Sequence, residues 1–127
     1  MERKCTGIII DDEEDLLDLY ADYFFLKGFS IIGKGIDGCQ AEQLFIEKKP
    51  DFVILDINMP NYDGYYAIKK IKEKDPNAKI FVITGHNTCS LGEGEVEGIY
   101  QKPVNMKIVY DHICKSVCNN LPSSELV

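Results

Sequence analysis

The chain has 127 residues, of which 45% are hydrophobic and 28% are charged. This composition is typical of one folded globular domain and excludes a disordered protein. The formal net charge is −7, and no stripe of Lys and Arg offsets it, so we expect no binding to nucleic acid. Every apolar run is shorter than a membrane span or the core of a signal peptide, so we expect a cytoplasmic protein that does not enter the membrane.

The five cysteines exclude two further classes of protein. Their number is odd, and no two of them stand three positions apart as in a zinc knuckle. This pattern argues against both a disulfide framework and a zinc site, so we expect small, reduced thiols.

Short apolar runs alternate along the chain with amphipathic stretches. Continuous apolar runs predict buried strands, and apolar residues at helical spacing predict helices. The order of these elements predicts a parallel sheet with helices on both faces. The expected strands are residues 5–10, 29–33, 52–55, 79–84 and 99–101, and the expected helices are residues 13–27, 38–49, 65–74 and 105–117.

A further helix, the fourth in chain order, would fall between the last two strands. Residues 85–98 carry Gly92, Gly94 and Gly98. Glycine destabilises a helix by about 1 kcal/mol per position relative to alanine. We therefore expect this fourth helix to be short, irregular or absent.

Polar residues stand at the ends of four of the expected strands. Asp11 and Asp12 follow the first strand, Asp56 the third, Thr84 ends the fourth, and Lys102 follows the fifth. In a parallel sheet these ends meet at one edge, where such folds bind ligands. Clustered carboxylates favour a hard cation such as Mg²⁺, and a lysine and a threonine beside them suit a phosphoryl group. Asp56 is then a candidate nucleophile that forms an acyl phosphate.

These residues, with the segments "LDINMPNYDGY", "FVITG" and "YQKP", resemble the receiver domain of two-component response regulators. The resemblance covers about residues 4–118. It implies a flavodoxin-like, doubly wound sheet of five parallel strands in the order 2-1-3-4-5. We expect a receiver domain over residues 1–120, and a tail or the start of a linker over residues 121–127.

The resemblance also implies a role for each site residue. Asp56 would take a phosphoryl group from the phosphohistidine of a sensor histidine kinase, and Lys102 and Thr84 would hold that group. Mg²⁺ would be bound by Asp12 and Asp56, by Asp11 mainly through water, and by the backbone carbonyl of Asn58. A cis peptide bond is expected before Pro103. Phosphorylation would switch the conformation that a downstream effector protein or domain recognises.

One switch residue departs from the pattern of the family. Receivers usually have an aromatic residue three positions before the lysine, and this chain has Ile99 there, followed by Tyr100. A regular strand directs Tyr100 to the opposite face, so either Ile99 fills the place or a bulge brings Tyr100 into it. His86 lies near the expected phosphate, although a surface loop histidine is the favoured interpretation.

Other interpretations stay open. Glu13, Glu14 and Asp15 are best explained as acids in the first turn of a helix. The domain could be a degenerate receiver that only binds partners. A phosphatase of the haloacid-dehalogenase type is disfavoured because Asn58 stands where that class has a second aspartate. We expect no enzyme activity beyond the domain's own phosphorylation and slow dephosphorylation. The sequence does not name the kinase or the output, and it leaves open a homodimer.

Overall fold

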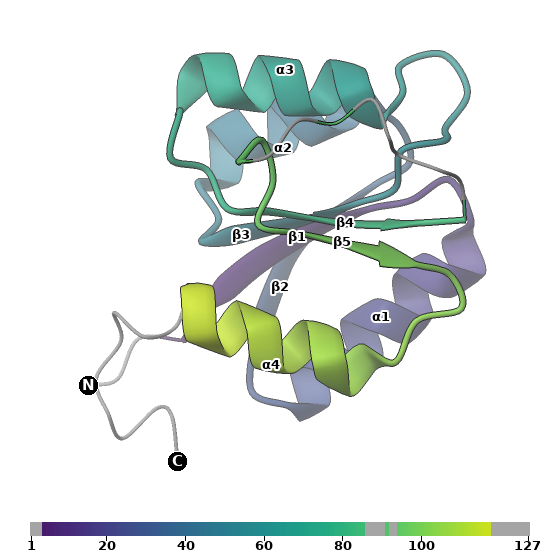
Figure 1. The fold of residues 1–127 in the computed structure, drawn as a ribbon, viewed down its shortest axis with the longest axis vertical. Coiled ribbons are helices and arrows are strands. Elements are labelled where there is room, and N and C mark those ends of the chain that lie inside the picture. Colours follow the sequence, from purple (N-terminus) through teal and green to yellow (C-terminus); the bar gives the residue numbers. More distant parts are fainter. Residues whose placement is uncertain (1–3, 86–90, 92–93, 118–127) are drawn as a thin grey trace.

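Five short apolar segments form one parallel sheet in the computed structural model, which describes residues 4–85, 91 and 94–117 (Figure 1). The strands lie in the order β2-β1-β3-β4-β5, which confirms the predicted order. Their bounds are β1 (Thr6–Ile10), β2 (Ser30–Gly35), β3 (Phe52–Leu55), β4 (Ile80–Thr84) and β5 (Gly98–Gln101).

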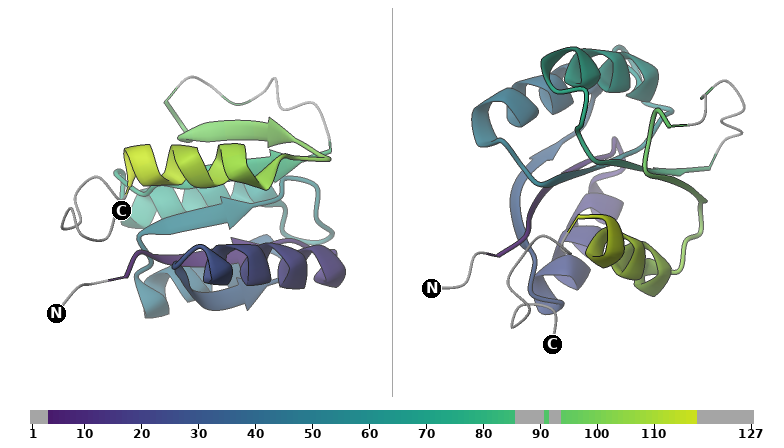
Figure 2. Two further views of the ribbon diagram at one scale, coloured as in Figure 1. Left: turned by 90° about the horizontal axis from the view of Figure 1, so that it is seen from below. Right: turned by 60° about the vertical axis from the view of Figure 1, so that its left-hand side comes forward.

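Among the described residues, four helices cover the two faces of this sheet. Two of them, α1 (Glu14–Leu26) and α4 (Met106–Ser116), lie on one face, and α2 (Gly38–Lys48) and α3 (Gly64–Lys74) lie on the other (Figures 1 and 2). This arrangement confirms the predicted doubly wound α/β fold. In the part of the chain that the structure describes, no helix has the length and apolar character needed to cross a bilayer.

The first turns of three helices are capped by side chains. Asp37, Asp63 and Asn105 precede α2, α3 and α4, and each accepts a hydrogen bond from a backbone N–H of the following helix. Such caps satisfy amide groups that have no partner within the helix. Glu13, which precedes α1, makes no such side-chain bond.

Apolar side chains pack against the sheet in two clusters, one for each face. The cluster under α1 and α4 is rich in aromatic residues, and we call it the aromatic cluster. The cluster under α2 and α3 is aliphatic. The aromatic cluster includes Tyr20, Phe24, Phe29, Phe52, Phe81 and Ile83, and the aliphatic cluster includes Ile8, Ile10, Val53, Leu55, Ile71 and Val82.

The second strand is longer than the sequence pattern predicts. It continues past the expected end at residue 33 to Gly35, because its pairing with β1 continues through Ile9↔Lys34 and Ile10↔Gly35. The apolar pattern stops earlier since Lys34 is polar and exposed. Hydrogen bonding to a neighbouring strand decides this boundary.

The segment between β4 and β5 is only partly described. Residues 86–90 and 92–93 lie outside the described part, and so do His86, Gly92 and the expected domain boundary near residue 120. Residues 85, 91 and 94–97 belong to no helix. Leu91 and Val96 pack against the aliphatic cluster.

Candidate functional site

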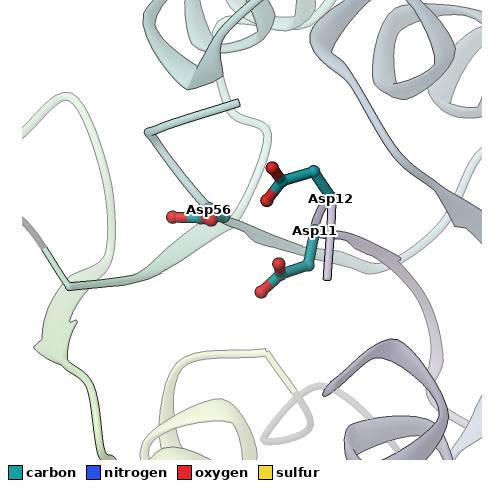
Figure 3. Close-up of side chains that lie close together, drawn as sticks. All are labelled: Asp11, Asp12 and Asp56. Carbon is teal, nitrogen blue, oxygen red and sulfur yellow. The ribbon is translucent and has the colours of Figure 1, made fainter. Parts of the chain in front are cut away.

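Three carboxylates gather at the carboxyl ends of β1 and β3. Asp11 and Asp12 follow β1, Asp56 follows β3, and one carboxylate oxygen of each lies within 4.8 Å of the others (Figure 3). Asp11 and Asp56 are buried, with 2% and 5% of their surface exposed, whereas Asp12 is exposed to solvent. The structure thus brings together the three aspartates that the sequence predicted to meet.

The loop after Asp56 is held by short backbone contacts. The amide of Gly64 donates a hydrogen bond to the carbonyl of Ile57 at 2.8 Å. A Cβ atom at Gly64 would lie 2.5 Å from the carbonyl oxygen of Asp56, which leaves no room for any other residue. The amide of Asn58 donates to Asp56 Oδ1 at 3.4 Å. Glycine at position 64 therefore lets helix α3 begin directly against the backbone of Asp56 and Ile57.

Lys102 joins the carboxylates from the end of β5. Its Nζ lies 2.9 Å from Asp11 Oδ2, 3.5 Å from Asp56 Oδ2 and 3.8 Å from Glu13 Oε2. Its backbone amide donates to the carbonyl of Thr84 at 2.9 Å. The peptide bond between Lys102 and Pro103 is cis, as predicted.

Thr84 completes the edge at the end of β4 and has 1% of its surface exposed. Its strand neighbours alternate between the faces of the sheet, so Thr84 shares a face with Val82 in the aliphatic cluster. The Thr84 hydroxyl and the Lys102 ammonium thus come from neighbouring strands at the same end of the sheet.

The electrostatics of the site follow from burial of like charges. Burial raises the pKa of Asp56 above its ordinary value, and the neighbouring Asp11 raises it further, against the opposing effects of Lys102 and the Asn58 amide. Burial disfavours the charge of Lys102 and is the largest single influence on it. The hydrogen bond to Asp11 and the charges of Asp11, Asp56 and Glu13 nevertheless raise the pKa of Lys102.

This donor set fits a magnesium ion. Mg²⁺ prefers oxygen ligands and takes one or two carboxylates while keeping several waters. Asp11 and Asp56 supply buried oxygens, and Asp12 supplies an oxygen on the side open to solvent. A divalent cation there would also relieve the repulsion that raises the pKa of Asp56.

The two candidate switch residues lie on opposite faces of β5. Tyr100 pairs with Ile83 and packs against the aromatic cluster, where its hydroxyl contacts His112 Nδ1. Ile99 pairs with Val82, on the face of Thr84, and 45% of its surface is exposed. The prediction that a regular strand directs Tyr100 away from Thr84 is confirmed, and no bulge brings the ring back.

Two residues near the site were not predicted to belong to it. The sequence analysis assigned Glu13 only to the start of a helix, yet its carboxylate lies 3.8 Å from Lys102. Tyr20 fits the apolar stripe of α1. Burial raises the pKa of its phenol, and the nearby charges also act on that pKa, those of Lys102, Asp11, Glu13 and Asp56. Only the three-dimensional structure shows that Glu13 makes no side-chain cap on α1 and lies beside Lys102 instead.

Comparison with known proteins places this fold and site in one family. The sequence profile of the response regulator receiver domain matches residues 8–113, and the chain belongs to this family. It is therefore a receiver domain of the two-component signalling type, a class of signalling modules that are in general not enzymes. This membership sets aside the phosphatase alternative.

Individual relatives include chemotaxis proteins and a transcriptional regulatory protein. The chain is 39% identical over 75 residues to chemotaxis protein CheY of Thermotoga maritima, which is 59% of this chain and 62% of that protein. It is 35% identical over 84 residues to CheY of Bacillus subtilis, or 66% and 70% of the two chains. It is also 33% identical over 114 residues to the transcriptional regulatory protein YesN of B. subtilis, covering 88% of this chain but 28% of YesN.

Solved structures share the fold, among them two of signalling proteins with beryllium fluoride and magnesium. CheY of Borrelia burgdorferi, in a complex with CheX, BeF₃ and Mg, superposes with a TM-score of 0.80 at 26% identity, covering 87% of each chain. The response regulator TrrA of T. maritima, in complex with Mg²⁺ and BeF, has a TM-score of 0.80 at 25% identity, covering 89% of this chain and 98% of that one.

Proposed function

We propose that this receiver domain is a phosphoacceptor: Asp56 takes a phosphoryl group from the phosphohistidine of a sensor histidine kinase. The observation that carries the proposal is the position of the Asp56 carboxylate, which is buried at the end of β3 with Lys102 Nζ 3.5 Å away. The charged side chains expected at such a site, Asp11, Asp12 and Lys102, lie around it, which argues against a degenerate receiver.

The transfer exchanges one bond to phosphorus for another. A carboxylate oxygen of Asp56 attacks the phosphorus, and the phosphorus–nitrogen bond of the donor breaks, with its electron pair leaving on the histidine nitrogen. Lys102 neutralises the developing charge on the phosphoryl oxygens, and the Thr84 hydroxyl donates a hydrogen bond to one of them. Asp12, Asp56 and the Asn58 carbonyl, with Asp11 mainly through water, would hold Mg²⁺, which would supply further positive charge to the same oxygens.

The product would then be recognised by a downstream partner. Thr84 ends β4, and Lys102 directly follows β5. When these two side chains bind the phosphoryl group, they would therefore shift the ends of both strands. Two of the similar structures contain a beryllium fluoride group together with magnesium, and one of these includes the partner CheX. These neighbours support a switch of this kind, whose output here is an effector protein or domain.

The test is phosphorylation with a small donor. Acetyl phosphate and Mg²⁺ should add one phosphoryl group to the protein, as measured by intact mass, and omission of Mg²⁺ should prevent the addition. Asp56→Asn should gain nothing, whereas the matched control Asp22→Asn, an exposed aspartate of α1, should react like the wild type. An Asp56→Asn protein that still gains the group would refute the assignment, and an inert wild type would favour the degenerate receiver.

A further inference from the structure

The Lys102 ammonium lies near two kinds of carboxylate, candidate metal ligands and one that lies outside the metal cluster. Its Nζ lies 2.9 Å from Asp11 Oδ2 and 3.5 Å from Asp56 Oδ2, and both aspartates belong to the cluster that fits a metal. Its third carboxylate neighbour, Glu13 at 3.8 Å, lies outside that cluster. The Lys102 ammonium therefore lies between the candidate metal ligands and the Glu13 carboxylate, which is not one of them.

A divalent cation competes with Lys102 for the same oxygens. Two positive charges that share the Asp11 and Asp56 carboxylates repel each other strongly in a site shielded from water. The Lys102 side chain is 17% exposed, so bulk solvent cannot fully replace its lost partners. The ammonium needs other acceptors while the metal is bound.

Such acceptors lie on the side of α1. A surface depression of about 390 Å³ is lined by Glu13, Tyr20 and Lys102, and its other walls are apolar, among them Leu16 and Met106. The Glu13 carboxylate makes no cap on α1 and is 61% exposed, so it can follow the ammonium. The depression thus places a carboxylate and a phenol beside the lysine.

Tyr20 supports this view because its hydroxyl has no hydrogen bond to any residue that the structure describes. Only 4% of the residue is exposed, and buried hydroxyl groups generally have a partner. Burial raises the pKa of Tyr20, and the nearby charge of Lys102 acts in the opposite direction. A phenol oxygen can accept a hydrogen bond from an ammonium group.

We propose that Glu13 and the Tyr20 hydroxyl form a second binding place for the Lys102 ammonium, which it occupies when a divalent cation holds Asp11 and Asp56. Both are positioning residues: they keep Lys102 charged and close until a phosphoryl group arrives to draw it back. The proposal rests on the metal site of the proposed function and requires no phosphoryl transfer.

Mg²⁺ affinity in calorimetric titrations tests the two residues against matched controls. Glu13→Gln should bind Mg²⁺ about two- to fivefold more weakly than Glu14→Gln, which removes an equal, exposed charge from the next position. Tyr20→Phe should bind about threefold or more weakly than Tyr23→Phe, since hydrogen bonds to charged groups are the stronger ones. Tyr20→Phe keeps its ring in the core, so the thermal midpoint without Mg²⁺ should stay close to that of Tyr23→Phe.

A double-mutant cycle separates this mechanism from simple attraction between Glu13 and the metal. If Glu13 acts through the lysine, the difference between Glu13→Gln and Glu14→Gln should vanish in a Lys102→Met background. A difference of the same size in that background overturns the role of Glu13.

The position of the lysine can be observed directly by NMR. Nuclear Overhauser effects between the Lys102 ε-protons and the Tyr20 ring should strengthen when Mg²⁺ is added to the wild type. Effects that do not respond to Mg²⁺ overturn the proposal, as do equal affinities within both matched pairs. If the Mg²⁺ results hold while acetyl phosphate leaves the protein unmodified, the proposed function fails and this inference stands.

Discussion

The core of the sheet and its carboxyl edge are built from the same strands but have opposite effects on stability. Along β1, Ile8, Ile9 and Ile10 are fully buried apolar residues, and the next residue is the buried Asp11. Burial of the apolar side chains stabilises the fold, whereas burial of the carboxylates beside one another opposes it. The comparison teaches that this domain maintains a binding site at the expense of local stability, and that the core must supply the difference.

The core should respond most strongly to substitution. Phe24 is fully buried, with its ring centroid 5.7 Å from that of Phe29 and 6.2 Å from that of Phe52. Phe24→Ala should lower the free energy of unfolding by about 3–5 kcal/mol, because it removes this apolar contact and leaves a cavity. Urea denaturation followed by circular dichroism measures the loss.

The neighbouring residue provides the control. Phe25 is 68% exposed, so Phe25→Ala should change the free energy of unfolding by no more than about 0.5 kcal/mol. Similar losses for the two variants would mean that α1 does not pack as described.

The edge should respond with the opposite sign. Asp56→Asn should raise the free energy of unfolding at about pH 7 by about 1 kcal/mol, because it removes a buried charge beside Asp11 and keeps the shape of the side chain. The pKa of Asp56 lies above the ordinary 3.8, so ionisation of Asp56 destabilises the fold. This destabilisation is absent below the ordinary pKa and grows as the pH rises through the pKa of the folded protein.

Urea denaturation across this pH range therefore sharpens the comparison. The advantage of Asp56→Asn over the wild type should shrink as the pH falls toward 3.8. Addition of Mg²⁺ should stabilise the wild type more than Asp56→Asn, because only the wild type retains the full ligand set. A variant that is less stable than the wild type at neutral pH would contradict this account of the edge.

A small effect, comparable in size to that of Asp56→Asn, is expected where the core reaches β5. Tyr100→Phe removes the hydroxyl that contacts His112 but keeps the ring in the aromatic cluster. The free energy of unfolding should fall by about 0.5–1.5 kcal/mol, as for the loss of one hydrogen bond. Because Tyr100 faces away from Thr84, the shift of the Thr84 amide resonance on addition of beryllofluoride should match that of the wild type. A lost Thr84 response would place Tyr100 in the switch.

The sequence by itself determined which segments form strands and helices and which polar residues lie at the strand ends. Continuous apolar runs such as residues 52–55, separated by amphipathic helices, favour strands of a covered parallel sheet, and Asp56 marks the end of that run. Because parallel strands end at a common edge, the convergence of Asp11, Asp12, Asp56, Thr84 and Lys102 followed without coordinates.

Only the tertiary structure decided how Lys102 is shared and where the aromatic side chain of β5 lies. The contact between Lys102 and Asp11 joins residues 91 positions apart, and no local pattern contains its geometry. The same holds for Glu13, whose position in the chain fits a helix start as well as an ion pair. It also holds for Tyr20, because helical spacing predicts its burial in the core but not its nearness to Lys102. Periodicity reports which side of an element is buried, whereas partners across the sheet depend on how separate elements pack.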